Sequence, residues 1–242
     1  MTELFLTPVH DAQLVWRYSP ILRGAIRTLN YLVENGPIGL TPTKALKRYF
    51  VEWAAEVFEW PGFEPADLYA VNKVLNEQDF PPLVMLHDLL LNTRLARHHK
   101  GHLTVTRLGR ALLREPTRLW SLLLNELLFH TDHGRYMREP YRFDGDWEMI
   151  LDIINLEAHL GASEDQICAA LININEEEIR RDYVLSSIIY MYVLRPLTWS
   201  GLLSEVASGS GLAREYIYLK TPLWAAALDL PSDALLPAQA LH

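Results

Sequence analysis

Apolar residues recur along most of the chain at the 3.6-residue spacing of amphipathic helices, which predicts a mostly helical protein. Turn-forming residues such as Asn35-Gly36-Pro37 separate the successive apolar stripes. The pattern predicts helices over residues 20–33, 41–57, 66–75, 81–97, 107–113, 116–129, 147–160, 164–171, 175–194, 196–205 and 221–228.

Two short segments alternate polar and apolar residues with a period of two, which is typical of strands. They are His102–Thr106 and Glu215–Lys220. Each leads into a predicted helix, and we expect Thr106 and Thr221 to cap these helices through their hydroxyl groups. The same order of helix, turn, strand and capped helix in both halves predicts a duplicated module.

A polar, turn-rich segment with Gly134, Pro140 and Gly145 predicts the boundary between these modules. We therefore expect an extended N-terminal arm over residues 1–19, a first module over 20–130, a linker over 131–146, a second module over 147–232 and a frayed tail over 233–242. The predicted fold class is mostly α, with a small β wing in each module.

The composition is that of a globular protein, because 50% of the 242 residues are apolar and 21% are charged. A single cysteine, Cys168, excludes an internal disulfide and favours a reducing compartment. The N-terminus shows no basic region followed by an apolar stretch, and no apolar run is long enough to span a bilayer. We therefore expect a cytoplasmic protein with no membrane partner.

Charge is distributed unevenly along the chain, although the net charge is −8. The first 120 residues carry 14 basic and 12 acidic side chains, whereas the remaining 122 carry 8 and 18. The segment 94–118 holds seven cations and only one acid, Glu115. Such a polarised chain can present one basic face to a nucleic acid or to an acidic partner.

Several helices, a short hairpin and a threonine-capped ending resemble a winged-helix domain. The residues that carry this resemblance are Leu95–His99, Lys100-Gly101, Leu103–Thr106 and Gly109–Leu113. The resemblance implies either DNA binding or a role in protein interaction or dimerisation, because winged helices serve both purposes.

Residues 37–130 also resemble the helical C-terminal region of a family of bacterial plasmid ORF-3-type proteins, and residues 197–228 do so more weakly. The matching features are Gly39-Leu40-Thr41, Leu86-His87, Leu103–Gly109 and Arg114-Glu115-Pro116. The usual N-terminal domain of that family is absent from this chain. The family has no settled activity, so the resemblance implies a fold and no reaction.

The basic segment is the main candidate for a binding site. Its candidate contact residues for nucleic acid or for a partner are Arg94, Arg97, Lys100, His102, Arg107, Arg110 and Arg114. In a DNA-binding winged helix, these side chains would contact phosphates from a helix ending near Arg97 and from the hairpin tip. The alternative is a solvated basic face that acidic residues, such as those of 144–157, neutralise.

Other chemistry-bearing residues have simpler structural explanations. The histidines at 98, 99, 102, 130 and 133 do not match the spacing of a closed metal site. Acidic residues at 144–148 and 176–178 suit helix starts. Cys168 lies in an apolar helix, and no nucleophile turn or phosphate loop is present. We therefore predict no enzyme activity, cofactor, metal or small-molecule substrate.

Aromatic residues cluster at Trp53, Phe58, Trp60, Phe63 and Tyr69, where they predict a core with an exposed turn at 60–63 that suits a protein partner. The sequence thus favours a non-catalytic protein-interaction or scaffold module that binds a partner or itself. The alternative is a DNA-binding regulator, of transcription or of a plasmid or mobile element, that uses residues 94–118.

Overall fold

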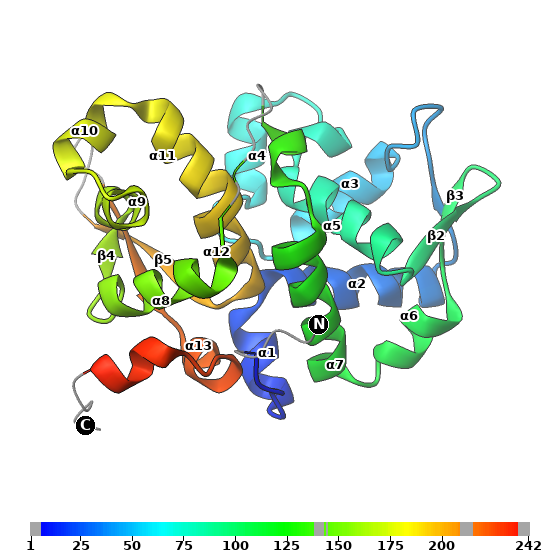
Figure 1. The fold of residues 1–242 in the computed structure, drawn as a ribbon. Helices are drawn as coiled ribbons and strands as arrows, with labels where there is room; N and C mark the ends of the chain where they lie inside the picture. Colours follow the sequence, from blue (N-terminus) through cyan, green and yellow to red (C-terminus); the bar gives the residue numbers. More distant parts are fainter. Residues whose placement is uncertain (1–5, 138–142, 144, 209–214, 237–242) are drawn as a thin grey trace. The chain divides into compact units, whose positions relative to one another are not determined.

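The computed structural model describes residues 6–137, 143, 145–208 and 215–236. The chain folds as two compact units. Residues 10–130 form the N-terminal unit, and residues 131–242 together with 1–9 form the C-terminal unit. Both are mostly helical, as predicted, and each contains one small three-stranded antiparallel sheet (Figure 1).

The N-terminal unit surrounds a core of aromatic and leucine side chains, the largest being Trp60, Trp120 and Phe50. Its strands are β1 (Ile38–Gly39), β2 (Ala96–His99) and β3 (His102–Val105). Its helices and helical turns are α1 (Ala12–Tyr18), α2 (Pro20–Glu34), α3 (Arg48–Val57), α4 (Pro65–Val71), η1 (Glu77–Asp79), α5 (Pro81–Asn92), α6 (Arg107–Leu112), α7 (Pro116–Asn125) and the π-helical turn η2 (Glu126–His130).

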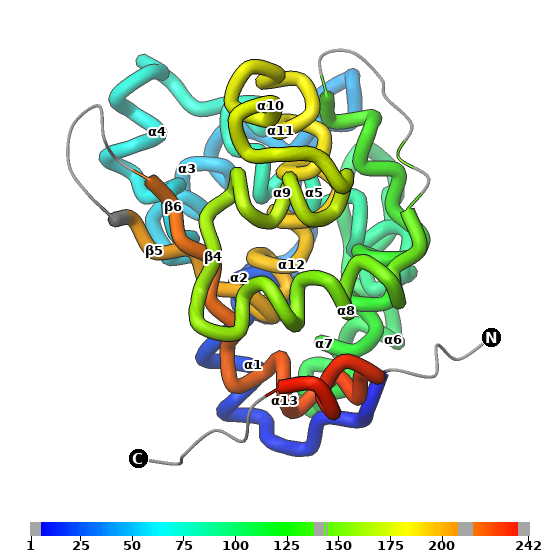
Figure 2. Tube along the Cα trace, turned by 60° about the vertical axis from the view of Figure 1, so that its left-hand side comes forward, coloured from blue at the N-terminus to red at the C-terminus, as the bar shows by residue number. Residues whose placement is uncertain are grey.

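The C-terminal unit contains a sheet in which β6 lies between β4 and β5 (Figure 2). These strands are β4 (Ala162–Ser163), β5 (Leu203–Ser208) and β6 (Glu215–Lys220). The helices and helical turns are η3 (His133–Tyr136), α8 (Trp147–Glu157), α9 (Glu164–Ile172), α10 (Glu176–Arg181), α11 (Tyr183–Ile189), the π-helical turn η4 (Tyr190–Leu194), α12 (Arg195–Ser200), α13 (Pro222–Ala227) and η6 (Pro231–Leu235).

The two units share one order of elements. In each, a two-residue strand precedes several helices, and the first strand then joins the outer edge of the later hairpin, giving sheet orders β1-β3-β2 and β4-β6-β5. The threonines predicted as helix caps also occupy equivalent places. Thr106 Oγ1 accepts from the N–H of Gly109, and Thr221 Oγ1 accepts from the N–H of Leu223.

The same two threonines tie each hairpin to the helix before it. Thr106 donates its hydroxyl to the Arg94 carbonyl at 2.7 Å, and Thr221 donates its hydroxyl to the Gly201 carbonyl at 2.6 Å. Arg94 and Gly201 both have left-handed backbones, with φ of 58° and 91°. The repeat is therefore present in hydrogen bonding as well as in topology.

Two helix boundaries in the N-terminal unit differ from the prediction. Helix α5 ends at Asn92 and not near Arg97, because Arg94 turns left-handed and residues 96–99 pair with β3. Residues 41–47 form a turn before α3, since Thr41 accepts hydrogen bonds from the N–H groups of Lys44 and Ala45. Lys44 there has a φ of 67°, which a right-handed helix does not allow.

The expected extended arm over residues 1–19 contains helix α1. Asp11 caps this helix by accepting hydrogen bonds from the N–H groups of Gln13 and Leu14. The tail predicted from residue 233 is ordered over its first three residues, within η6. There Ser232 is buried, and its hydroxyl accepts a hydrogen bond from Asn155. Residues 237–242 lie outside the described residues.

The helix predicted over residues 175–194 is interrupted at Asp182, whose carboxylate caps α11. The helix predicted over 196–205 ends at Ser200, because Gly201 turns left-handed and residues 203–208 enter the sheet.

In the described part of the chain, no helix has the length and apolar character needed to cross a bilayer.

Candidate functional site

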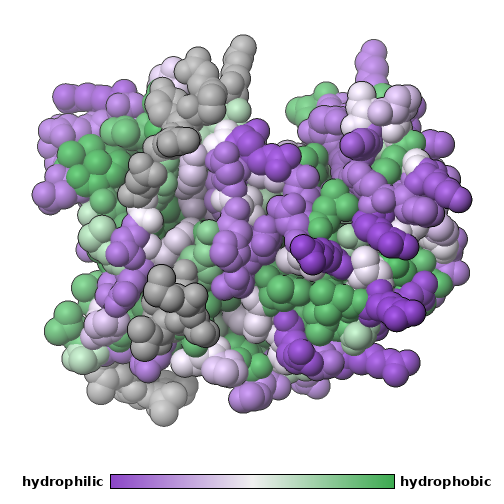
Figure 3. Space-filling model, turned by 45° about the vertical axis from the view of Figure 1, so that its right-hand side comes forward, coloured by the Kyte–Doolittle hydropathy of each residue, from purple (hydrophilic) through white to green (hydrophobic). Residues whose placement is uncertain are grey.

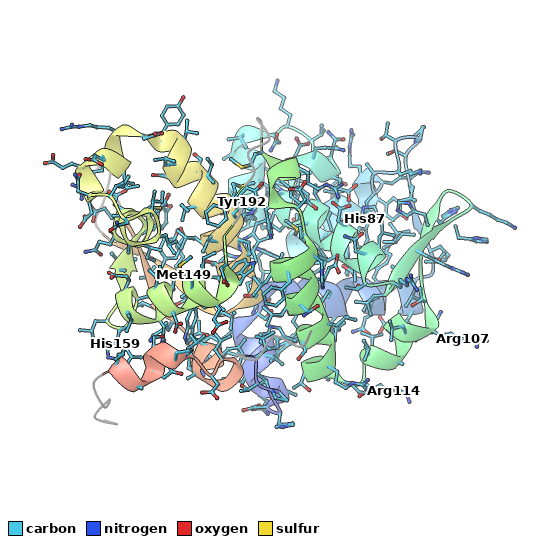
Figure 4. All side chains as sticks on the ribbon, in the orientation of Figure 1. His87, Arg107, Arg114, Met149, His159 and Tyr192 are labelled. Atoms are coloured by element: carbon cyan, nitrogen blue, oxygen red, sulfur yellow. The ribbon has the colours of Figure 1, made fainter. Side chains whose placement is uncertain are left out.

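The seven predicted contact residues follow one continuous path through the N-terminal unit. Arg94 is at the corner between α5 and β2, Arg97 is on β2, Lys100 is in the hairpin turn and His102 is on β3. Arg107 and Arg110 lie on α6, and Arg114 follows it. All seven side chains are exposed. In Figure 4, Arg107 and Arg114 point away from the body of the unit at the two ends of α6.

The pairing of β2 with β3 gives the hairpin one outward and one inward face. Arg97 is opposite Thr104, and His99 is opposite His102, so these side chains share one face of the ribbon. His99 and Arg97 are exposed, whereas Leu103 on the other face is fully buried. The hairpin therefore presents cationic and imidazole groups to solvent while its apolar face packs inward.

Helix α6 packs closely against the start of this hairpin. A Cβ atom added at Gly109 would lie 2.3 Å from the Leu95 carbonyl oxygen, so only glycine allows this approach. The close contact fixes the direction of α6 from the hairpin base. Arg107 and Arg110, on either side of Gly109, are exposed.

The structure adds three cations that the sequence prediction missed. Strand β1 pairs with β3, and the Leu40 N–H donates to the Gly101 carbonyl at 2.9 Å. The loop after β1 therefore lies beside the hairpin turn. It carries the exposed side chains of Lys44 and Lys47, and the exposed Arg48 begins α3 directly after it. Three cations within five residues were the available sequence signal. We call these three and the seven predicted residues the basic surface.

The cations of the basic surface lack acidic partners. Within the described ranges, none of them forms an ion pair with a carboxylate. The neighbouring Arg118 behaves differently, since it pairs with Glu115 at 2.6 Å. Figure 3 brings the hairpin side of this unit forward and shows strongly hydrophilic side chains standing out from it. The surface is therefore exposed positive charge that no described carboxylate neutralises in an ion pair.

Helix α5 is not part of that surface. Most of its side chains are buried, including Leu83, Leu86 and Leu89. A helix ending near Arg97 was predicted to bring this side chain toward a nucleic acid, but Arg97 lies on β2. The exposed basic side chains of the basic surface therefore come from the hairpin, the loop after β1 and α6, and not from α5.

A chain of three polar side chains, of which Glu77 and His87 are buried and His98 is half-buried, connects segments next to the basic surface. Glu77 accepts the Leu46 N–H at 2.6 Å through one oxygen and contacts His87 Nδ1 at 2.7 Å through the other. The second nitrogen of His87, Nε2, lies 2.9 Å from Nε2 of His98. The chain joins the loop after β1, helix α5 and strand β2, and thus three segments that carry or support the basic surface.

A hollow of about 310 Å³ opens above this chain. Its lining mixes polar and apolar groups of the loop after β1, the start of α3 and the η1 turn; it comprises Thr41, Thr43, Ala45, Leu46, Lys47, Arg48, Asn76, Glu77 and Gln78. The carboxylate of Glu77, at one edge of the hollow, is held by the Leu46 N–H and by His87 Nδ1.

The remaining candidate residues have structural roles in the described chain. Among the described residues, no group of three or more His, Cys, Asp or Glu side chains is placed to hold a metal ion. Cys168 is fully buried, and burial together with Glu164 and Asp165 raises the pKa of its thiol to about 12. Asp146 and Glu176 lie at helix starts, as predicted.

The aromatic cluster is mainly core. Phe58 and Trp60 are buried, whereas Pro61 and Gly62 of the predicted turn at 60–63 are exposed. Exposed apolar side chains follow instead on α4 and just after it, where Tyr69, Val71 and Val74 are 42%, 82% and 46% exposed. A second, apolar surface is therefore present on the same unit.

Comparison with known proteins places the chain in a family. Two domain models match it: the Y4jL N-terminal domain over residues 17–118 and the y4jL C-terminal domain over residues 137–222. "Uncharacterized protein y4jL" of Sinorhizobium fredii (strain NBRC 101917 / NGR234) is 40% identical over 154 residues, which are 63% of this chain and 70% of that protein. No solved structure matches the chain.

These matches do not test the resemblance to winged helices or to plasmid ORF-3-type proteins, which stays a prediction. They agree with the two units of the fold, since each domain model falls mainly within one unit. The chain belongs to the two-domain y4jL family.

Proposed function

We propose that this chain is a non-catalytic nucleic-acid-binding protein whose basic surface contacts duplex DNA. The observation that carries the proposal is the exposure of the whole basic surface without acidic partners in the described chain. Lysine and arginine side chains of this kind neutralise phosphates and release counterions, which supplies most of the affinity of sequence-independent binding.

The element order supports the same proposal. We take the order of a short strand, several helices and a hairpin that joins this strand as support, because this order resembles that of a winged-helix domain. In this chain the hairpin and α6 would contact the phosphate backbone of the DNA, because α5 is largely buried. We therefore expect binding that tolerates changes of base sequence, since phosphate contacts position a protein without reading bases.

Fluorescence anisotropy of the full chain with a labelled duplex of about 20 base pairs tests the proposal. We expect the logarithm of the association constant to fall linearly with the logarithm of the salt concentration. The slope should be roughly −0.9 for each phosphate contacted. The variant R97E/K100E reverses two charges on the hairpin. It should weaken binding at least about tenfold near 100 mM salt.

The matched control is R180E/R181E, which changes the net charge equally on α10. Arg180 and Arg181 are exposed and pair with Glu176 and Glu177, outside the basic surface. Its binding should stay within about twofold of the wild type. The proposal is wrong if the wild type fails to bind at low salt, or if both variants weaken binding equally.

A protein-interaction role is the second candidate, and the exposed side chains of Tyr69, Val71 and Val74 favour it. Substituting Val71 with Glu would place a charge at the most exposed of these three side chains. If the surface mediates self-association, V71E should shift the sedimentation coefficient toward the monomer, whereas V33E, on an exposed position of α2, should not.

A further inference from the structure

Arg195 in the C-terminal unit lies at an irregularity of its helix. Its backbone N–H donates to the Tyr190 carbonyl, five residues earlier, which closes the π-helical turn η4. Pro196 explains the widening, because proline has no N–H and its ring crowds the carbonyl four residues before it. Such π-helical turns occur frequently at functional sites.

The Arg195 side chain is buried and has no acidic partner among the described residues. The residue is 7% exposed, and within the described chain no carboxylate lies within ion-pair distance of its guanidinium. Its guanidinium carbon lies 4.7 Å from the Trp199 ring centre and 5.7 Å from that of Tyr136. Burial lowers the pKa of this guanidinium to about 10, so it remains charged at neutral pH.

The unpaired donors of Arg195 have a specific geometry. Its Nε and Nη2 atoms are buried and have no hydrogen-bond partner among the described atoms. These two nitrogens form one edge of the planar guanidinium, and their N–H groups point in parallel. That edge matches two oxygens of one carboxylate or phosphate group, which arginine binds in a bidentate manner.

We propose that Arg195 anchors a binding site in the C-terminal unit for a small oxyanion, a carboxylate or a phosphate group. The site is separate from the basic surface, which lies on the other unit and is solvated. An isolated buried guanidinium is strongly unfavourable, and a bound oxyanion would offset both its charge and its two unused donors. The aromatic rings of Trp199 and Tyr136 would flank the Arg195 guanidinium that binds the oxyanion.

Burial of both nitrogens also sets how the ligand would enter. Neither atom exposes appreciable surface, so exchange with solvent requires local opening of the unit. We therefore expect slow binding, and an Nε–H proton that exchanges slowly with water even in the free protein. The exposed arginines of the basic surface should lack this protection.

Arginine Nε–H resonances of the full chain, labelled with ¹⁵N, give a readout specific to the site. A slowly exchanging resonance should shift saturably with acetate or with phosphate, and not with sodium chloride at equal ionic strength. The acetate and phosphate arms identify which oxyanion the site prefers. The proposal is overturned if neither anion moves a protected Nε–H resonance.

Thermal unfolding with variants provides the second measurement. At an anion concentration tenfold above Kd, the Tm of the wild type should rise by about 3 °C over the chloride control. R195K keeps the charge but loses the two-donor edge, so it should lose this rise, whereas K73A, at an exposed lysine outside both proposed sites, should keep it. An equal rise in R195K would overturn the proposal. If R195K does not fold, the resonance test on the wild type decides.

Discussion

The Nε2 atoms of His87 and His98 lie 2.9 Å apart, and this contact joins helix α5 to strand β2 of the basic hairpin. Only one proton fits between two nitrogens at this distance. The Nδ1 atom of His87 is 2.7 Å from Glu77, which also holds the loop after β1 through the Leu46 N–H. The support of the basic surface therefore includes this contact between two histidines.

Acidification should destabilise this unit through His98. Burial is the largest cause that lowers its pKa, followed by repulsion from His87 and Lys44; Glu77 and Asp88 oppose the shift. A histidine with a lowered pKa binds its proton preferentially in the unfolded chain. Its stabilising contribution is complete above its usual pKa of 6.5 and is lost as the pH falls through the lowered value.

The variant H98Q tests this dependence, because glutamine keeps an N–H donor for His87 but does not titrate. We expect a flatter decline in urea midpoint between about pH 8 and pH 5 than in the wild type. H10Q, at an exposed histidine, should follow the wild-type curve. Identical pH curves for H98Q and the wild type would contradict the role of the pair.

Substituting Gly109 with Ala should destabilise the chain, contrary to helix propensity. Propensity alone predicts a gain of about 1 kcal/mol for this change within a helix. The added Cβ would meet the Leu95 carbonyl, and the resulting shift should cost about 1–3 kcal/mol.

Urea unfolding measures the sign of the Gly109 effect directly. A111G, at an exposed position of the same helix, is the control and should cost only the propensity of about 1 kcal/mol. A stabilised G109A would show that α6 does not pack closely on the hairpin.

Asn155 should be a major source of stability in the C-terminal unit. This buried side chain accepts from Lys220 at 2.7 Å and from Trp224 at 3.1 Å, and it donates to Ser232 and Asp233. N155L removes these bonds and should cost about 1–3 kcal/mol for each buried group left unsatisfied.

Thermal unfolding of N155L should therefore show a clearly lower Tm. The control is N30A, at an exposed position within α2, which should change stability by no more than about 0.5 kcal/mol. Equal effects of N155L and N30A would mean that the hub around Asn155 contributes no stability.

The loop after β1 should contribute to DNA binding as the hairpin does. In K44A/R48A, the slope of log affinity against log salt should become shallower by about 1 for each cation that contacts a phosphate. Anisotropy at several salt concentrations measures this slope. K73A, outside the basic surface, should leave the slope unchanged. A K44A/R48A slope equal to that of the wild type would show that Lys44 and Arg48 do not contact phosphates.

Much of the local structure was predictable from the sequence because its causes are local. Apolar periodicity and Asn35-Gly36-Pro37 placed α2, and alternation placed β3 and β6. Thr106 and Thr221 were correctly predicted as caps. The run of cations in 94–118 is a property of the sequence itself, so the core of the candidate site was found without coordinates.

The predictions failed where a residue's partner is distant in the chain. Helix α5 stops early because β2 finds a hydrogen-bonding partner in β3, and the two-residue strand β1 exists only through pairing with β3, more than sixty residues away. No periodicity marks a strand of two residues. For the same reason, the sequence did not place Lys44, Lys47 and Arg48 beside the hairpin.

The sequence by itself determined the helical class, the two-part organisation and the polarity of charge, since each follows from the type and spacing of neighbouring residues. Only the tertiary structure decided that His87 meets His98 and that Arg195 is buried without an acidic partner in the described chain. The energy of a buried polar group depends on which atoms the fold places around it, and local sequence carries no record of those atoms.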